Sequence, residues 1–272
     1  MTSTTTAPAP SAPPGPGPSP LRRRLLAWRV PAMRIGIVVA AALLVELAVE
    51  LRWVTPLQVA PPSVVLPTLW EGLTAGTYLV LLGITLAEVG TAFVGAAAVG
   101  TTLGYLLWRR PLYGRAYEPL LYALASSPIV LLYPVSLVMF GRTPVAVAVL
   151  GFAAGLFPVL ISTYQAFRRL DDTYIKVAKI MRLTPGQTFL RVLLPAALPS
   201  VLVGLRLGLT LTMLTVIAME YLANVGGVGA ELSLAYLRLR AADMYAALLL
   251  IIILSVTFLF LLNRATRMVV KR

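Results

Sequence analysis

The stretch KVAKIMRLTPGQTFLRVLLP, residues 176–195, joins two long apolar runs and has the pattern of two short helices. The dipeptide Asp171-Asp172 precedes it and should begin the first helix, because acidic residues favour the positive end of a helix. The tetrapeptide Thr184-Pro185-Gly186-Gln187 places an N-cap threonine three residues before a glutamine, which predicts a capping box and a second helix. Pro195 is expected to end that helix, and Pro199 to begin the next apolar segment. The connection is therefore predicted to be rigid.

The composition is that of an integral membrane protein. Of the 272 residues, 59% are hydrophobic and 12% are charged, whereas soluble domains carry about 25% charged residues. The sequence has no Cys and no His, which excludes thiol nucleophiles, disulfides, thiolate or imidazole metal ligands and histidine acid–base catalysis. It has no G-x-x-x-x-G-K-[ST] loop, so a partner must bind any ATP. We expect no catalytic site, no metal site and no cofactor in this chain.

Six apolar segments are long enough to cross a bilayer. Residues 35–51 form the first, which is interpreted as a retained helix because a cleaved signal peptide would have a shorter apolar core. The other five are about 79–107, 118–140, 144–164, 199–222 and 244–262. Residues 1–33 are Pro-rich and then basic, which predicts a disordered cytoplasmic tail. Residues 34–272 are predicted to form the transmembrane domain, with a cytoplasmic segment at 170–195.

The basic residues indicate the orientation. In a six-span arrangement with a cytoplasmic N-terminus, most of the 23 Lys and Arg residues fall in cytoplasmic segments. The outside segments hold only Arg52, Arg142, Arg238 and Arg240, and Arg206 lies within the fifth span. Because cytoplasmic loops are enriched in Lys and Arg, both termini are predicted to be cytoplasmic. The same asymmetry explains the net charge of +13 without a nucleic-acid partner.

With these segments placed, the sequence resembles the permease subunits of ATP-binding-cassette importers. The cytoplasmic motif of that family reads E-A-A, three residues, G, nine residues, I-x-L-P. Lys176-Val177-Ala178 takes the place of E-A-A, Arg182 that of G, and Val192-Leu193-Leu194-Pro195 that of I-x-L-P, with the spacing intact. Lys176 and Arg182 depart from the family pattern.

Five other stretches are similar to the same family. They are APPSVVLPTLWEGL (60–73), SSPIVLLYPVSLVMFG (126–141), GLFPVLISTYQAFRRLDD (155–172), LPAALPSVLVGLRLGLTL (194–211) and AMEYLANVGGVGAEL (218–232). The resemblance covers about residues 55–270. It is closest to the branch that handles nitrate, aliphatic sulfonates, taurine, bicarbonate or thiamin-precursor pyrimidines.

The resemblance implies an all-α, multi-pass protein of a bacterial plasma (inner) membrane, with six transmembrane helices and the type I importer permease fold. The implied partners are ABC ATPase subunits, an extracytoplasmic solute-binding protein, membrane lipid, and a second permease copy or a paralogous permease that completes a dimer. In the family the segment at 170–195 is the coupling helix, which docks on the ATPase. Its implied docking residues are Lys176, Val177, Ala178, Met181, Arg182, Pro185, Gly186 and Pro195. On its pattern alone, the segment could instead be an interfacial helix lying among anionic headgroups.

Polar residues and breaks inside spans are candidates for the translocation path, because such groups are costly in a bilayer. Glu220 lies late in the fifth span, either at the path or its outer gate, or at the interface where its carboxylate reaches water. Glu88 lies deeper, either on the path or paired with a basic residue such as Arg206. Pro128 marks either the path or a packing kink. The candidate path residues are therefore Glu88, Pro128, Arg206 and Glu220.

Two small-residue pairs, Gly100-xxx-Gly104 and Gly204-xxx-Gly208, predict close helix packing, more often within the subunit than across a dimer seam. The sequence thus favours an importer permease for a small organic or inorganic anion, or for a pyrimidine-type vitamin precursor. An ion-gradient-driven secondary transporter is the alternative, and it would usually show an internal inverted repeat. No repeat is evident. A membrane enzyme is disfavoured by the lack of His, Cys and clustered carboxylates.

Overall fold

The computed structural model describes residues 20–55 and 58–270, with side chains for residues 33–34, 36–55 and 58–264. Within this part of the chain every regular element is a helix, which confirms the predicted all-α class. The chain divides into two compact units, Met1–Trp53 and Val54–Arg272, which are described separately. In the first unit the described residues form one helix, α1 (Pro20–Glu50). It includes most of the predicted first span and begins within the range predicted for the tail, whose residues 1–19 lie outside the described residues.

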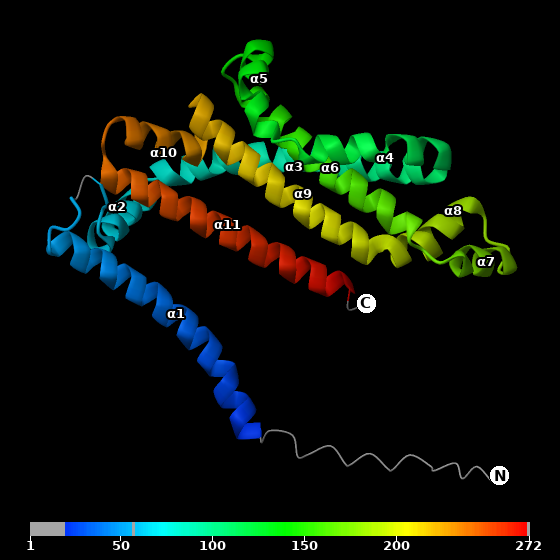
Figure 1. Ribbon diagram of the computed structural model, residues 1–272, viewed down its shortest axis with the longest axis horizontal. Coiled ribbons are helices and arrows are strands. Elements are labelled where there is room, and N and C mark those ends of the chain that lie inside the picture. Colours follow the sequence, from blue (N-terminus) through cyan, green and yellow to red (C-terminus); the bar gives the residue numbers. More distant parts are fainter. Residues whose placement is uncertain (1–19, 56–57, 271–272) are drawn as a thin grey trace, which may run out of the picture. The chain divides into compact units, whose positions relative to one another are not determined.

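The second unit contains twelve helical elements, and its α-helices are labelled in Figure 1. They are α2 (Pro62–Thr74), α3 (Thr77–Arg109), α4 (Pro111–Ser126), a 3-10 turn η1 (Ile129–Leu132), α5 (Tyr133–Phe140), α6 (Pro144–Arg168), α7 (Asp172–Ile180), α8 (Pro185–Thr188), a π-helical turn η2 (Phe189–Leu193), α9 (Leu194–Ala223), α10 (Gly227–Leu237) and α11 (Ala241–Val270). Among the described residues, four helical stretches are long and apolar enough to span a membrane: α3, α6, the run that contains α9, and α11. The helices on the two sides of a bend, Pro111–Ser126 and Ile129–Phe140, would form a fifth span if they are counted together. The total of six spans remains a prediction.

That bent pair corrects the predicted third span, because residues 118–140 do not form one helix. The chain breaks between α4 and η1, and the helices on the two sides differ in direction by 79°. Pro128 lacks an N–H and restricts the residue before it, so Ser127 is extended, with ψ 135°. Pro128 is exposed and stands at this bend.

The core of the second unit is built around α6, which packs against α3 on one side and α9 on the other. An added Cβ at Gly104 would lie 2.6 Å from the carbonyl oxygen of Leu160, and one at Gly208 would lie 2.5 Å from Cγ2 of Val159. Only glycine allows this close approach of helices. The prediction that the two glycine pairs pack within the subunit is confirmed.

The prolines near the start of α9 do not interrupt it, so the predicted helix end at Pro195 and the helix start at Pro199 are wrong. Pro195 lies in the first turn of α9, where a missing N–H costs little, and Pro199 is accommodated inside the helix. The turn η2 leads from α8 into α9 with helical backbone angles, and a π turn shifts the hydrogen-bond register. The chain from Pro185 into α9 is therefore helical without a break, and it bends between α8 and α9 (Figure 1).

Candidate functional site

The segment 170–195 keeps its shape through local hydrogen bonds. The Asp171 carboxylate accepts the backbone N–H of Thr173 at 2.7 Å and its hydroxyl at 2.6 Å. These two bonds hold the pKa of Asp171 below its usual value. The backbone N–H of Thr184 donates to Gln187 Oε1 at 3.0 Å, and the backbone N–H of Gln187 donates to Thr184 Oγ1 at 3.3 Å. Both predicted helix starts, including the capping box, are confirmed.

Between these helices the chain turns through a Schellman motif centred on Arg182. The backbone N–H of Leu183 donates to the carbonyl of Ala178 at 3.1 Å, and that of Arg182 donates to Lys179 at 3.0 Å. This motif requires a left-handed residue, which is usually glycine, and Arg182 has φ +49°. The position where the importer family carries glycine is therefore the position where this backbone needs one.

Arg182→Gly should consequently stabilise the turn by about 1 kcal/mol, because a left-handed non-glycine residue costs about 1–2 kcal/mol and the added chain entropy of glycine offsets part of the gain. Hydrogen exchange at the amide of Leu183 should slow correspondingly. Arg182→Ala is the matched control, since it removes the same side chain and keeps the strain. Equal exchange rates in the glycine and alanine variants would contradict this reading.

An aromatic cluster anchors the segment to the ends of two spans. Tyr105 and Trp108 come from α3, Phe167 from α6 and Phe189 from η2, and their neighbouring ring centroids lie 4.6–6.0 Å apart. Phe167 is 3% exposed, so its ring belongs to the core. The cluster therefore ties the segment to the ends of α3 and α6.

The apolar residues of α7 lie on two sides. Val177 is 42% exposed and Met181 63% exposed, and Ile180 extends the same open surface. Ala178, which the sequence groups with Val177 and Met181, is 2% exposed and lines a cavity of about 440 Å³ beneath the helix. The remaining proposed docking residues are all exposed: Lys176, Arg182, Pro185, Gly186 and Pro195. Ala178 therefore supports the segment from inside and does not belong to its open face.

At the other end of α9, two carboxyl groups meet inside the protein. Glu220 is fully buried and Glu88, from α3, is 4% exposed. The two side chains lie close together, because Gly229 of α10 binds Glu220 and the adjacent Val228 binds Thr85, which is one turn before Glu88 on α3. Two sequence interpretations are thus wrong: Glu220 does not reach water, and Glu88 does not pair with Arg206. Arg206 lies on the same helix as Glu220 but about 20 Å away along the axis, at 1.5 Å per residue.

Helix α10 folds back onto this pair. The backbone N–H of Gly229 donates to Glu220 Oε2 at 2.8 Å, and the backbone N–H of Val228 donates to Thr85 Oγ1 at 3.0 Å. Gly227 has φ +75°, and a Cβ there would overlap the Glu220 carboxyl group. Sequence reasoning missed the roles of Thr85 and these glycines, although the Gly226-Gly227-x-Gly229 spacing after Glu220 was a usable signal.

Gly227→Ala should destabilise the protein by about 3 kcal/mol, from a left-handed backbone cost of about 1–2 kcal/mol and overpacking of about 1–3 kcal/mol. Thermal unfolding of the purified protein would measure the loss. Gly90→Ala on α3 is the control, because nothing lies within 4 Å of its added Cβ and helix propensity favours alanine. Similar unfolding temperatures for the two variants would show that α10 does not pack on Glu220 in this way.

Arg206 stands near the middle of α9 on an exposed stripe of that helix. Its neighbours on the stripe are Val203, Leu207 and Leu214, which are 50–64% exposed, and the exposed Thr210. Among the side chains described, Arg206 has no ion-pair partner. Arg142, by contrast, donates from Nη2 to the carbonyl of Ala223 at 2.7 Å and caps the C-terminal end of α9.

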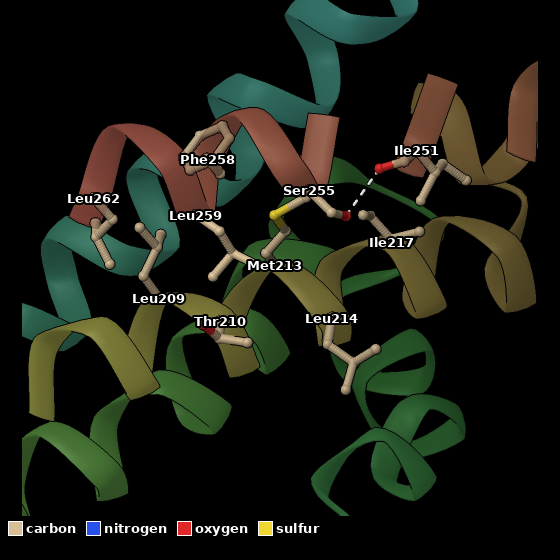
Figure 2. A pocket seen from close by; sticks show the side chains of 10 residues that line it. All are labelled: Leu209, Thr210, Met213, Leu214, Ile217, Ile251, Ser255, Phe258, Leu259 and Leu262. Carbon is tan, nitrogen blue, oxygen red and sulfur yellow. Dashed lines mark hydrogen bonds between the residues drawn. The ribbon is translucent and has the colours of Figure 1, made fainter. Parts of the chain in front are cut away.

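A second cavity lies beside this stripe, between α9 and α11. Figure 2 shows its ten lining side chains, which are apolar except for the hydroxyls of Thr210 and Ser255. The Ser255 hydroxyl donates to the carbonyl of Ile251 at 2.8 Å, so it is already used. The cavity, of about 220 Å³, therefore offers no charged group to a polar solute.

Residues 96–272 match the family described as "Binding-protein-dependent transport system inner membrane component". The chain is similar to a chain of the inward-facing MetNI methionine ABC transporter, with a TM-score of 0.60 and 23% identity over 69% of this chain and 94% of that one. This likeness confirms the predicted type I importer permease fold.

Three curated relatives carry names with a solute. The bicarbonate transport system permease protein CmpB of Synechocystis sp. is 32% identical over 53% of this chain and 53% of its own length. The nitrate import permease protein NrtB of Synechococcus elongatus is 27% identical over 62% of this chain and 60% of its own. The putative aliphatic sulfonates transport permease protein SsuC of Bacillus subtilis is 29% identical over 62% of this chain and 61% of its own. The match thus spans less than two thirds of each relative.

Proposed function

The chain belongs to the family of binding-protein-dependent transport system inner membrane components, and from this premise we propose that it is the permease subunit of an ATP-driven importer of a small anion. Membership makes it a transport subunit of a bacterial inner membrane and not an enzyme. Its predicted location and its predicted lack of enzymatic activity are confirmed.

The observation that carries the anion proposal is Arg206 on the exposed stripe of α9. A charged side chain at the centre of a span costs about 2.5–3.5 kcal/mol or more when it faces lipid. The stripe is therefore expected to face a second permease copy or a water-filled path, and not lipid. In either arrangement, the guanidinium group offers a bidentate site for a carboxylate-like or sulfonate-like anion. The relatives named for bicarbonate, nitrate and sulfonates agree with a solute of this kind.

We further propose that an exposed apolar face docks on an ATPase subunit. Tyr174, Val177 and Ile180 of α7 form this face together with Met181, the C-cap of the helix. These side chains are 42–81% exposed, and an apolar surface of this kind marks an interaction site. The capped helices and the aromatic cluster make the segment stiff, and η2 joins it directly to α9. Closure of the ATPases would then move the attached end of α9 and with it the Arg206 stripe.

ATP-dependent uptake tests the proposal. The chain, its co-purifying ATPase and its binding protein would be reconstituted in liposomes and supplied with radiolabelled bicarbonate, nitrate or an alkylsulfonate. We expect saturable uptake of one anion that stops when ATP is omitted and persists when ion gradients are collapsed. Uptake driven by an ion gradient without ATP would support the secondary transporter instead. Uptake of a neutral pyrimidine alone would overturn the anion proposal and retain the importer.

A further inference from the structure

The pair formed by Glu88 and Glu220 has chemistry that the transport proposal does not use. Both oxygens of Glu88 and Oε1 of Glu220 lack a hydrogen-bond partner among the described residues. Burial of a polar group without a partner costs free energy, and burial of an unpaired charge costs far more. The two carboxyl groups, from α3 and α9, nevertheless share one buried region beneath the first turn of α10. As two ionised carboxylates, they would leave these three oxygens without a donor among the described residues.

The surrounding charges do not supply a cation. Arg240, in the loop between α10 and α11, is engaged elsewhere: it pairs with Glu231 of α10 at 3.2 Å and with Asp243 of α11 at 3.3 Å. The neighbouring loop before α6 contributes Arg142, whose guanidinium group is bound to the end of α9. Two adjacent carboxylates without a cation repel each other too strongly for both to be ionised.

We infer that Glu88 and Glu220 form a proton-binding site, in which one carboxyl group holds a proton and donates it to the other. A single proton satisfies the site because it removes one charge and supplies the hydrogen-bond donor that two carboxylates lack. The second oxygen of Glu220 stays with the Gly229 amide. The shared proton thereby joins α3 to α9.

A metal ion fits the same atoms poorly. Oxygen-ligated cations such as Ca²⁺ take about six to eight ligands, and the described residues contain no group of three acidic, His or Cys side chains that could hold one. Glu220 Oε2 already accepts the Gly229 amide, and Thr85 Oγ1 already accepts the Val228 amide. A proton needs no further ligands, so it is the occupant that these contacts favour.

The position of the site gives the proton a structural consequence. It lies at the end of α9 opposite the segment 170–195, beneath the first turn of α10, where Gly227 packs on the carboxyl group. Loss of the proton would leave two buried charges under α10 and loosen its contact with α3 and α9. This inference does not rest on the transport proposal, because it concerns the fold of this chain alone.

Infrared spectroscopy of the full chain in lipid nanodiscs tests the inference. At about pH 7, where an exposed carboxyl group is ionised, wild type should show the C=O band of a protonated carboxyl group, shifted by exchange into D₂O. Glu88→Gln and Glu220→Gln should each lose this band, because the amide donates to the remaining carboxylate. Glu71→Gln, at an exposed position of α2, should retain it. Absence of the band in wild type, or its survival in both glutamine variants, would overturn the proposal.

Thermal unfolding against pH provides a second readout. The unfolded chain releases its carboxyl protons above about pH 4.3, whereas the folded pair keeps one. Stability should therefore fall as pH rises above that value until the folded pair also releases its proton, with the unfolding constant growing up to about tenfold per pH unit. Glu88→Gln should remove this dependence of stability on pH. If Glu220→Gln does not fold, the measurement on Glu88→Gln is sufficient for the test. The measurement is made in choline chloride and repeated in sodium chloride. Stabilisation of wild type, but not of Glu88→Gln, by sodium would identify a metal cation as the occupant and refute the proton site.

Discussion

Met181→Glu should abolish binding of the partner ATPase while leaving the permease folded. Met181 is 63% exposed in this chain, so a charged side chain there meets water in the free permease and disturbs no internal packing. On docking, the same carboxylate would lose its water without gaining a partner, which costs several kcal/mol. Since about 1.4 kcal/mol corresponds to a tenfold change in affinity, the complex should weaken at least about a hundredfold. Pull-down of the ATPase with the detergent-solubilised permease measures this loss.

Two matched variants separate docking from other effects. Met181→Leu keeps the apolar surface and should bind the ATPase as wild type does. Reversal of both Lys176 and Arg182 to Glu tests the rival interpretation, in which the segment lies among anionic headgroups. That change should weaken ATPase binding in a salt-dependent way if the ATPase carries facing acids. Wild-type ATPase binding by Met181→Glu and by the double reversal would mean that this segment is not the docking element.

The predictions that succeeded from sequence depend on neighbours along the chain. The caps at Asp171 and Thr184 were predictable because each cap is complete within four residues. The glycine pairs on α3 and α9 were also visible, since small residues four apart form a ridge on one helix face. The left-handed turn at Arg182 could also have been found from the sequence, because Arg182 takes the place of a glycine in the family motif.

The predictions that failed from sequence depend on how helices face each other. The apolar residues of α7 are too many for one narrow face, and the aromatic cluster of the spans decides that Ala178 turns inward while Met181 stays open. Glu88 and Glu220 are far apart in the sequence, and the rotation of α3 against α9 determines that they meet. A pairing of Glu88 with Arg206 was chemically sensible, but it required a contact at a different level of α9.

Arg206→Gln should lower ATP-driven anion uptake by about ten- to a hundredfold, because a hydrogen bond to a charged group is worth about 1.5–3 kcal/mol. The assembled protein should remain intact, since Arg206 is exposed and has no ion-pair partner among the described side chains. Arg206→Lys keeps the charge but not the planar fork, so it should retain part of the uptake and bind the anion less selectively.

A substitution at another position of the exposed stripe on α9 supplies the control for Arg206→Gln. Thr210→Val changes an exposed residue one turn away, at nearly constant volume and without altering charge. Because Thr210 donates its hydroxyl to the carbonyl of Arg206 at 3.0 Å, the substitution also tests whether that local bond matters. We expect uptake within about twofold of wild type, since replacement of an exposed hydroxyl shifts free energy by only about 0.5 kcal/mol. Equal loss of uptake in Thr210→Val and Arg206→Gln would assign the effect to disturbed packing of the stripe, and undiminished uptake by Arg206→Gln would remove this arginine from the anion path.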